Sequence, residues 1–467
     1  MELGIEPRPW RPTDSMAVFH AALHRFGLFG GKELRNVELL KKLGADEFNR
    51  QYPLNNPKSV TTIAGLAPPG GRRACLDRPL YDRVGLGAGE RTRRRERNLL
   101  RVFERVGFPA KYGSFVALIG PRRSASGRTV FLCCPQMKFY RPAIVHEVAL
   151  HGGGFDVAGM AFPGVPAVIL GRNRTVVWGL TSGHADNVDT FVEELDPANP
   201  RRYRFKGQWR ELASREETFR VKGAAPQRRA ILRSVHGPII AEDKARGLAY
   251  AYQYTFWMKE YTTLEAFLDL ARCTSLEQFR AACRKVSLSF NFFYSDVEGR
   301  IAFQFCGLYR VPAEGADVRL PVSGTGAMEW RGMVPFEDLP YRVDPPKGYF
   351  ANWNNKPGPD WDNGDNLPWT GYNSVYWITD VIEDHPKMTF DAVRAIPRLI
   401  DTHGSYEQIV ELSLPAFRAE NILPPGQCGF LGPGGRPQRH ATDQQPLADR
   451  WELKTWLWAP SADAWGR

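Results

Sequence analysis

The sequence predicts an α+β protein with a large layered β-sheet core, and three observations lead to this class. From about residue 114 onward, short apolar segments follow one another closely and are divided by Gly- and Pro-rich turns, as in strands. Segments with helical spacing are grouped between the strands and do not alternate with them one for one. A chain of 467 residues with 43% hydrophobic and 12% aromatic residues can bury a sizeable core, which excludes wholesale disorder.

Residues 1–66 are predicted to form a helical region. A helix start is expected at Pro12–Ser15, because apolar residues then recur with helical spacing from Met16 to Leu23. A glycine-rich break separates this helix from a second one, predicted over Lys32–Leu43. Glu33 lies in the first turn of the second helix, where the helix dipole favours a carboxylate.

Residues 67–113 are predicted to be a basic spacer. They are Pro/Gly-rich and then Arg-rich, with one short helix near Asn98–Val106 and a run of arginines at 91, 93, 94, 95, 97 and 101. Such a run could bind nucleic acid, but no recognisable reading module accompanies it. A solvated, protease-accessible linker is the favoured interpretation, so no nucleic-acid partner is expected.

The stretch from Tyr112 to Gln136 combines a serine with a predicted buried hairpin. Gly113 directly precedes Ser114, and the apolar strand Phe115–Ile119 follows at once. A polar turn then leads to a second apolar strand over Thr129–Cys134. If the chain is cut before the serine, the new amino terminus lies at the end of a rigid central strand.

The rest of the chain is read as further strands with two pairs of helices. Strands are predicted over 143–150, 155–160, 167–170, 175–179, 188–195, 203–209, 218–221, 230–240, 248–257, 288–294, 301–306 and 348–353. Helices are predicted over 263–273, 276–286, 376–383 and 389–399. The glycines at 152–154 join two strands, so they predict a tight turn and not a phosphate cradle. Residues 421–467 are predicted to be an irregular tail.

Cysteine usage and the chain's apolar runs exclude several kinds of site. The seven cysteines contain no C-x-x-C pair, so neither a zinc site nor a redox motif is predicted. The first fifteen residues show no signal peptide, and no apolar run is long enough to span a bilayer. These observations do not indicate the cellular compartment of the protein.

Several ordered motifs carry a resemblance to a known family. They are GGKELRN from Gly30, Gly113-Ser114 before an apolar strand, GRTVFLCCPQM from Gly127, HEVALHGGGFDVAGMAFPGVP from His146, GRNRTVVWGLTSGHADNVDTFVE from Gly171 and GYFANWNNKP from Gly348. Over roughly residues 4–409 the chain resembles the penicillin acylase family of N-terminal-nucleophile hydrolases.

The resemblance implies a four-layer αββα sandwich, with residues 114–420 as an incomplete nucleophile-bearing region. It implies a precursor that cuts itself into a small and a large chain, which remain partners. It also implies hydrolysis of a linear amide between an acyl group and an amine, as in acylated β-lactam nuclei or acyl-homoserine lactones. Members of the family are typically periplasmic or secreted.

The resemblance also assigns roles to individual residues. Ser114 matches the nucleophile, and Gln136 matches the residue whose backbone helps to hold the new amino terminus. Ser182 matches the position that offers a backbone N–H to the oxyanion, and Asn354 matches the side-chain donor to the same oxyanion. The ligands of a structural calcium ion are matched by Glu33, Asp186, Val188 (through its carbonyl), Asp189 and Asp365.

The chemistry of these residues is coherent without the family. A serine hydroxyl needs a base, and the chain offers no G-x-S-x-G elbow. A free α-amino group has a pKa of about 7.7–8.0, so it can act as that base, directly or through a water. An amide side chain and a backbone N–H suit an oxyanion hole, and the carboxylates suit a hard cation such as calcium. His151, His184 and His236 lack metal spacing and are interpreted as structural.

Departures from the family pattern leave other hypotheses open. Phe115 stands where an asparagine is usual after the serine, and Trp377 stands where an arginine is common. The family's leading and carboxy-terminal portions are absent, which suggests truncation at both ends. The second hypothesis is therefore a catalytically inactive family member that acts as a binding or scaffold protein. A nucleic-acid binder that uses the arginine run is the third.

Overall fold

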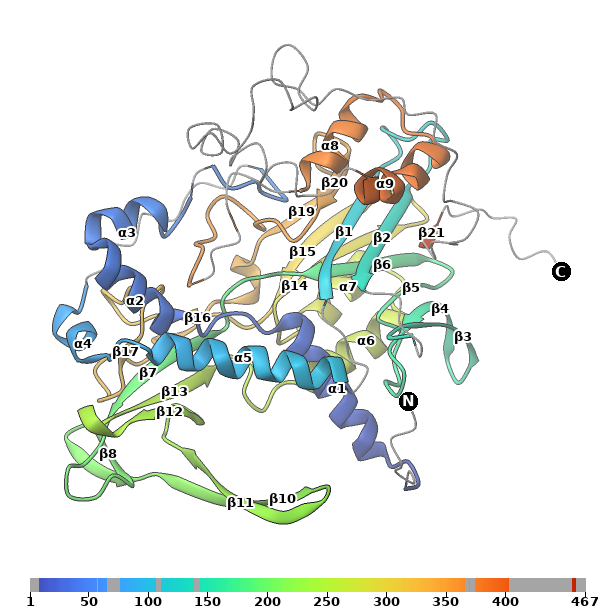
Figure 1. Cartoon of the computed structure of the whole chain (residues 1–467). Helices are drawn as coiled ribbons and strands as arrows, with labels where there is room; N and C mark the ends of the chain where they lie inside the picture. The colour runs from blue at the N-terminus through green and yellow to red at the C-terminus, as the bar shows by residue number, and fades with distance from the viewer. Residues whose placement is uncertain are drawn as a thin grey trace, which may run out of the picture.

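The computed structural model describes residues 8–56, 58–64, 76–105, 111–137, 143–365, 369, 374–402 and 456–458. It combines helices with several β-sheets, which confirms the predicted α+β class (Figure 1). The α-helices of this part of the chain are α1 (Pro12–Gly27), α2 (Glu33–Leu43), α3 (Ala45–Gln51), α4 (Arg78–Arg83), α5 (Ala88–Arg105), α6 (Thr262–Arg272), α7 (Leu276–Cys283), α8 (Tyr376–Glu383) and α9 (Phe390–Thr402). Two 3₁₀-helices are η1 (Lys244–Arg246) and η2 (Phe336–Asp338).

Two sheets, one of four strands and one of seven, form the centre of the molecule. The four-stranded sheet has the order β20-β1-β2-β21, with β20 (Tyr349–Asn352), β1 (Lys111–Ile119), β2 (Val130–Met137) and β21 (Trp456–Trp458). The seven-stranded sheet has the order β19-β15-β14-β6-β5-β4-β3, with β19 (Tyr341–Val343), β15 (Ile301–Cys306), β14 (Phe290–Asp296), β6 (Val176–Ser182), β5 (Leu170–Arg172), β4 (Phe155–Ala161) and β3 (His146–Gly152).

The other sheets have four strands or two. A second four-stranded sheet has the order β12-β13-β7-β17, with β12 (Ile239–Asp243), β13 (Leu248–Tyr254), β7 (Val188–Glu194) and β17 (Val322–Ser323). Three strand pairs complete the set: β8 (Arg202–Phe205) with β9 (Gln208–Glu211), β10 (Ala213–Val221) with β11 (Ala224–Arg233), and β16 (Arg310–Val311) with β18 (Gly332–Met333).

Strand β1 is buried on both faces, and its side chains alternate between two cores, as the two-residue period of a strand requires. On one face, Phe115, Ala117 and Ile119 pack against the apolar sides of α8 and α9. On the other face, Val116 and Leu118 pack against aromatic residues of the seven-stranded sheet. Burial of each large apolar side chain stabilises the fold by about 1.5–3 kcal/mol, so the strand that carries Ser114 is held firmly.

The far face of the seven-stranded sheet is covered by α6, α7 and α1. Phe267 of α6 and Phe279 of α7 pack against Phe292 and Tyr294 of β14, with ring centroids 5.0–6.0 Å apart. Ser275 caps α7 by accepting a hydrogen bond from the backbone N–H of Gln278. Helices therefore pack on the outer faces of both central sheets.

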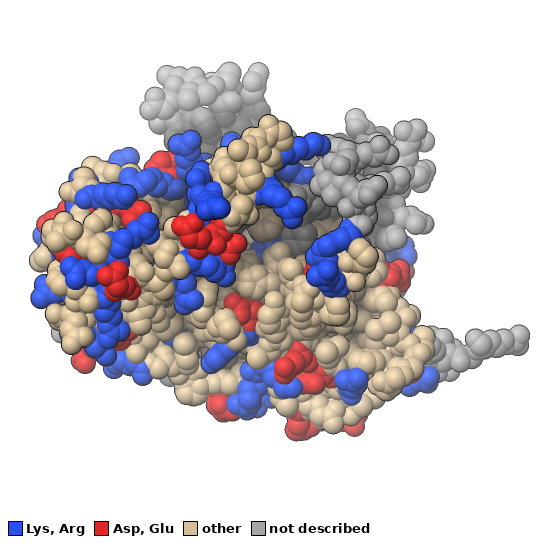
Figure 2. Space-filling view, turned by 90° about the horizontal axis from the view of Figure 1, so that it is seen from below, with Lys and Arg blue, Asp and Glu red and all other residues tan. Residues whose placement is uncertain are grey.

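The arginine run forms a longer helix than predicted. The short helix expected near residue 98 is α5, which begins at Ala88, because arginine is a good helix former and the run finds acidic partners. Arg93 and Arg97 pair with Glu90, and Glu38 of α2 accepts the backbone N–H groups of Gly87 and Gly89. On the face seen in Figure 2, basic side chains are mixed with acidic ones.

Several strand boundaries also differ from the prediction. The single strand expected over 203–209 is the hairpin β8–β9, because Lys206 and Gly207 both adopt positive φ and turn the chain. The strand expected over 230–240 divides into β11 and β12, and the one expected over 167–170 begins only at Leu170.

The carboxy-terminal segment contributes one element that was not predicted. Residues 456–458 of the expected irregular tail pair with β2 as strand β21. The remainder of that tail lies outside the described residues. Among the helices that the structure describes, none is both long and apolar enough to cross a membrane.

Candidate active site

Ser114 lies in the interior of the central sheet, and only 2% of its surface is exposed. It pairs with Pro135 of β2, while β20 pairs with β1 from Val116 onward. The chain leaves β20 and reaches Asn354 in a left-handed conformation with φ of 57°, which asparagine tolerates better than most residues. The turn is fixed because the backbone N–H of Asn354 donates to Asn352 Oδ1.

Asn354 contacts both polar groups of Ser114. Its Nδ2 donates to Ser114 Oγ at 3.1 Å, and its Oδ1 accepts the backbone N–H of Ser114 at 3.1 Å. The same Nδ2 donates to the carbonyl oxygen of Ser182 at 3.0 Å. The structure thus brings together three of the predicted catalytic residues around one serine hydroxyl.

Ser182 is held at the end of β6 by further hydrogen bonds. Its Oγ donates to the carbonyl of Phe26, the penultimate residue of α1, at 2.5 Å. Asn291 Nδ2 donates to the Ser182 carbonyl at 3.2 Å. These bonds join the site to α1 and β14, so the backbone around Ser182 is preorganised.

Gln136, the fourth predicted residue, lies beside the peptide bond that precedes Ser114. It is the cross-strand partner of Gly113, and its Oε1 accepts a hydrogen bond from Trp353 Nε1 at 2.8 Å. A Cβ atom on Gly113 would lie 2.4 Å from that oxygen, a distance at which atoms clash. The residue before the serine must therefore be glycine if Gln136 is to keep its place.

This contact predicts the behaviour of a Gly113→Ala variant. The added methyl group should displace Gln136 and shift the Gly113–Ser114 bond, and small misplacements of this kind can slow a reaction about a hundredfold. If the chain is cut before Ser114, as the resemblance implies, we expect this cleavage to be slower in the variant, measured on denaturing gels over time. Gly358→Ala is the control, because a Cβ there meets only ordinary contacts of 3.6 Å or more, and it should cleave at the unaltered rate.

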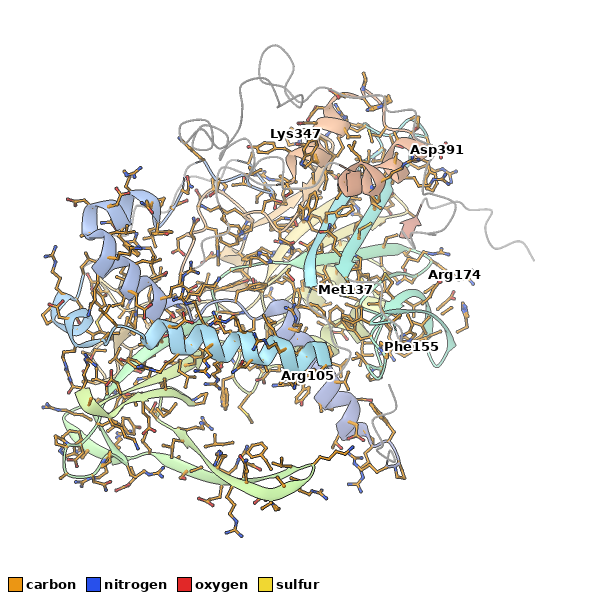
Figure 3. All side chains as sticks on the ribbon, viewed as in Figure 1. Arg105, Met137, Phe155, Arg174, Lys347 and Asp391 are labelled. Carbon is orange, nitrogen blue, oxygen red and sulfur yellow. The ribbon has the colours of Figure 1, made fainter. Side chains whose placement is uncertain are left out.

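An apolar cavity opens beside Ser114 and Ser182. Helices α1 and α6 and strands β2, β5, β6 and β14 contribute to its walls, together with the segment that follows β4. Met137, at the end of β2, is labelled in Figure 3. The lining side chains are Phe19, Ala22, Leu23, Phe26, Pro135, Met137, Phe162, Ile169, Leu170, Leu180, Phe267 and Phe290. The sequence analysis did not assign these residues, because apolar positions in so many separate elements look the same as core positions.

The histidines singled out in the sequence bond elsewhere. His151 pairs with Asp156, His236 lies between Glu193 and Glu329, and the ring of His184 lies tilted against that of Phe29. Within the described residues, the only side chain that hydrogen-bonds to Ser114 Oγ is that of Asn354. A Ser-His-Asp arrangement is therefore not formed by this part of the chain.

Three of the predicted calcium ligands form a compact buried cluster. Oxygens of Glu33, Asp186 and Asp365 all lie within 4.8 Å of one another. Burial raises the pKa of Glu33 and Asp186 well above their usual range and that of Asp365 to about 6, and the neighbouring carboxylates add to each rise. Asp365 Oδ1 is buried with no hydrogen-bond partner in the described residues.

The cluster has the donor set that a hard cation prefers. A Cβ on Gly30 would lie 2.1 Å from Asp186 Oδ1 and 3.0 Å from the Val188 carbonyl, so both oxygens border the same small space. Carboxylate and carbonyl oxygens are the usual ligands of Ca²⁺. Glu33, Asp186, Val188 and Asp365 therefore fit the predicted ion.

Asp189, the fifth predicted ligand, is not part of this cluster, and both of its carboxylate oxygens are bonded to Arg310. Arg310 Nε donates to Asp189 Oδ2 at 2.8 Å, and Nη2 pairs with Asp189 Oδ1 at 2.5 Å and Asp186 Oδ2 at 2.7 Å. Trp330 Nε1 also donates to Asp189. The sequence analysis did not single out Arg310, because one arginine after a tyrosine carries no motif.

Replacement of the Arg310 guanidinium should lower the stability of the fold. Arg310→Lys keeps the charge but loses the planar fork that binds two carboxylates, which should lower the free energy of unfolding by about 2 kcal/mol. Urea denaturation measures the change. Arg284→Lys is the matched control, since its pair with Glu337 is exposed on both sides, and it should change stability by less than about 0.5 kcal/mol.

Comparison with known proteins agrees with this geometry. The family model for penicillin amidase matches residues 1–456. This chain belongs to the penicillin amidase family. It is 31% identical over 427 residues to penicillin G acylase from Escherichia coli, which covers 83% of this chain and 50% of that protein.

Other members of the penicillin amidase family show similar likeness. An acyl-homoserine lactone acylase QuiP from Pseudomonas fluorescens is 27% identical, covering 76% of this chain and 42% of that protein. The structure of the thermostable penicillin G acylase from Alcaligenes faecalis superposes with a TM-score of 0.61 at 30% identity, covering 67% of this chain and 56% of that one. The chain spans about half the length of the curated relatives it matches.

Phe115 and Trp377, the two departures from the family pattern, lie away from the cavity lining. Phe115 packs against Trp353, with ring centroids 5.5 Å apart, and belongs to the core beneath α8 and α9. Trp377 lies in the first turn of α8. Neither side chain is among those that line the cavity beside Ser114.

Proposed function

We propose that this chain is an amidohydrolase of the penicillin acylase type, cut between Gly113 and Ser114 and built as a four-layer αββα N-terminal-nucleophile sandwich. The observation that carries the proposal is the pair of hydrogen bonds between Asn354 and Ser114: the Ser114 N–H donates to Asn354 Oδ1, and Ser114 Oγ accepts from Asn354 Nδ2. An amide side chain that contacts both groups would keep hold of the serine after its N–H had become a free amine. The small and large chains would stay together as one enzyme.

The reaction then follows from the groups at Ser114. Its α-amine takes the hydroxyl proton, directly or through a water, while Oγ attacks the substrate carbonyl carbon. Asn354 Nδ2 and the backbone N–H of Ser182 stabilise the oxyanion. The C–N bond breaks, the amine leaves with the proton, and the acyl group stays on Ser114 Oγ as an ester. A water molecule attacks the ester and releases the carboxylic acid.

The cavity supports an apolar acyl group. A substrate whose carbonyl lies at Ser114 would place its acyl chain among the aromatic and aliphatic side chains of α1, α6 and β14. Transfer of such a group from water is favourable by about 25 cal/mol per Å² of apolar surface buried. The substrates proposed are therefore small linear amides with an apolar acyl group, including acylated β-lactam nuclei and acyl-homoserine lactones.

We further propose that the carboxylate cluster holds a structural calcium ion. Bound there, the ion would neutralise buried charge and join the start of α2 to β7 and to Asp365. At a calcium concentration about 100 times the dissociation constant, the free energy of unfolding should rise by about 2.7 kcal/mol, measured by thermal unfolding. Asp365→Asn should lose most of this rise, and an equal rise in that variant would contradict the assignment.

Hydrolysis of a panel of chromogenic amides tests the proposed function. We expect the purified chain to release the chromogenic amine from arylacetyl and medium-chain alkanoyl amides, and to act poorly on a charged succinyl amide. Phe26→Arg, which places a charge in the cavity wall, should lower kcat/KM for the apolar amides. A folded chain that hydrolyses no member of the panel would instead support the inactive binding or scaffold protein.

A further inference from the structure

A second group of ionisable side chains comes from α1 and from the loop before α6, and it shares no residue with the proposed calcium ligands. His20, His24 and Glu260 each place one ligand atom within 4.8 Å of the others. The two imidazole rings lie close to one another, with centroids 4.1 Å apart. Neither the family match nor the proposed reaction uses these three residues.

Local structure explains why they meet. His20 and His24 are four residues apart on α1, so they project from the same face of the helix. Glu260 comes from the loop between β13 and α6, where Met258 adopts a left-handed conformation with φ of 64°. That loop is tied at both ends, because Lys259 N–H donates to the Phe256 carbonyl and Thr263 N–H donates to the Glu260 carbonyl.

The cluster contains a buried polar atom that the described residues leave without a partner. This atom is His24 Nε2, which has no hydrogen-bond partner. Glu260, which is only 8% exposed, places a carboxylate oxygen in the same group. A buried ring nitrogen is costly when unpaired, so its placement beside a second imidazole and a carboxylate points to a bound cation.

The surroundings of His24 suit a metal ligand. Its ring packs edge-on against Phe256, with centroids 5.4 Å apart, and lies near Tyr254. An apolar setting makes an unpartnered ring nitrogen costly, and a bound cation would remove that cost.

We propose that His20, His24 and Glu260 form a binding site for a divalent ion of the zinc class. Two imidazole nitrogens and one carboxylate oxygen are the donors that Zn²⁺ prefers, whereas Ca²⁺ prefers oxygen alone. Ligand atoms around a tetrahedral zinc lie about 3.4 Å apart, so modest side-chain rotations would close the observed separations. A water molecule would occupy the fourth position.

Such an ion would join two walls of the cavity beside Ser114. The helix that carries the histidines also places Phe19 and Phe26 in the cavity, and the loop that carries Glu260 leads into α6, which contributes Phe267. Phe19 and Phe267 already meet edge to face, with ring centroids 6.4 Å apart. The ion therefore holds α1 and α6 at a fixed separation on either side of the acyl pocket.

Titration of the full purified chain with Zn²⁺ tests the site. Calcium is kept in excess so that the carboxylate cluster is occupied. Calorimetry should show one tightly bound Zn²⁺ per chain, and Co²⁺ should give the visible absorption bands of a nitrogen-ligated ion. In His20→Ala and in Glu260→Gln the dissociation constant should rise by about 100-fold or more.

A matched control separates this site from other histidines. His146→Ala removes an exposed imidazole on β3, and it should bind Zn²⁺ as the unaltered chain does. Circular dichroism confirms that each variant is folded. The proposal is overturned if the unaltered chain shows no saturable binding, or if folded His20→Ala and Glu260→Gln chains bind Zn²⁺ as tightly as the control. Neither result depends on amide hydrolysis, so failure here is distinct from failure of the proposed function.

Discussion

A Ser114→Ala chain is expected to remain a single polypeptide and to hydrolyse no amide. The substitution removes Oγ. In the proposed mechanism this oxygen attacks the Gly113 carbonyl in the precursor and the substrate carbonyl in the mature enzyme. The substitution is small, and the strand is buried on both faces, so the fold should persist. A denaturing gel and an amide assay on the same preparation measure both losses.

Ser124→Ala is the control for this experiment. Ser124 is also buried, but it bonds to Ser126 in the turn after β1 and has no contact with the site. This variant should be cut and should hydrolyse amides as the unaltered chain does. Amide hydrolysis that survives in a Ser114→Ala chain would show that a different residue is the nucleophile.

Asn354→Asp should lower kcat by about 100- to 1,000-fold, which corresponds to about 3–4 kcal/mol. Aspartate has the same shape and tolerates the left-handed backbone at this position. It replaces the Nδ2 donor with an oxygen, so Ser114 Oγ and the developing oxyanion would both face negative charge. Single-turnover kinetics on processed enzyme separates this effect from any change in cleavage of the precursor.

Asn173→Asp serves as the matched control. Asn173 is a structural asparagine whose Nδ2 donates to the Cys273 carbonyl at 2.6 Å, far from Ser114 in the hydrogen-bond network. Its replacement should lower stability and leave kcat of the folded enzyme unchanged. If Asn354→Asp also retained the kcat of the unaltered chain, Asn354 would not be an oxyanion donor.

Much of the fold could be predicted from the local sequence pattern. The prediction was wrong at elements that form only through tertiary contacts. Helix α8 spans the residues predicted, and β14 and β15 overlap the strands predicted over 288–294 and 301–306, because the apolar pattern is clear there. Helix α5 was predicted too short, because a run of arginines is typical of a solvated linker and its pairing with Glu38 and Glu90 depends on the fold. Strand β21 depends wholly on its pairing with β2.

In the candidate active site, too, some residues could be predicted from local sequence, whereas others depend on tertiary contacts. Ser114, Ser182 and Asn354 could be named in advance because each lies within an ordered motif, and the structure places them in contact. The insertion of Arg310 among the acidic residues could not be foreseen, since it depends on how a two-residue strand packs. The cavity walls and the group around His24 also arise only when α1 docks beside α6.

The central claim is that Ser114 becomes an amino-terminal nucleophile, and the masses and first residues of the purified protein's chains test it most directly. We expect two fragments that copurify, the larger beginning Ser-Phe-Val-Ala, with a break at the Gly113–Ser114 bond. The Ser114→Ala protein should give one intact mass. An unaltered protein that stays intact indefinitely, or one cut only at another bond, would contradict the claim.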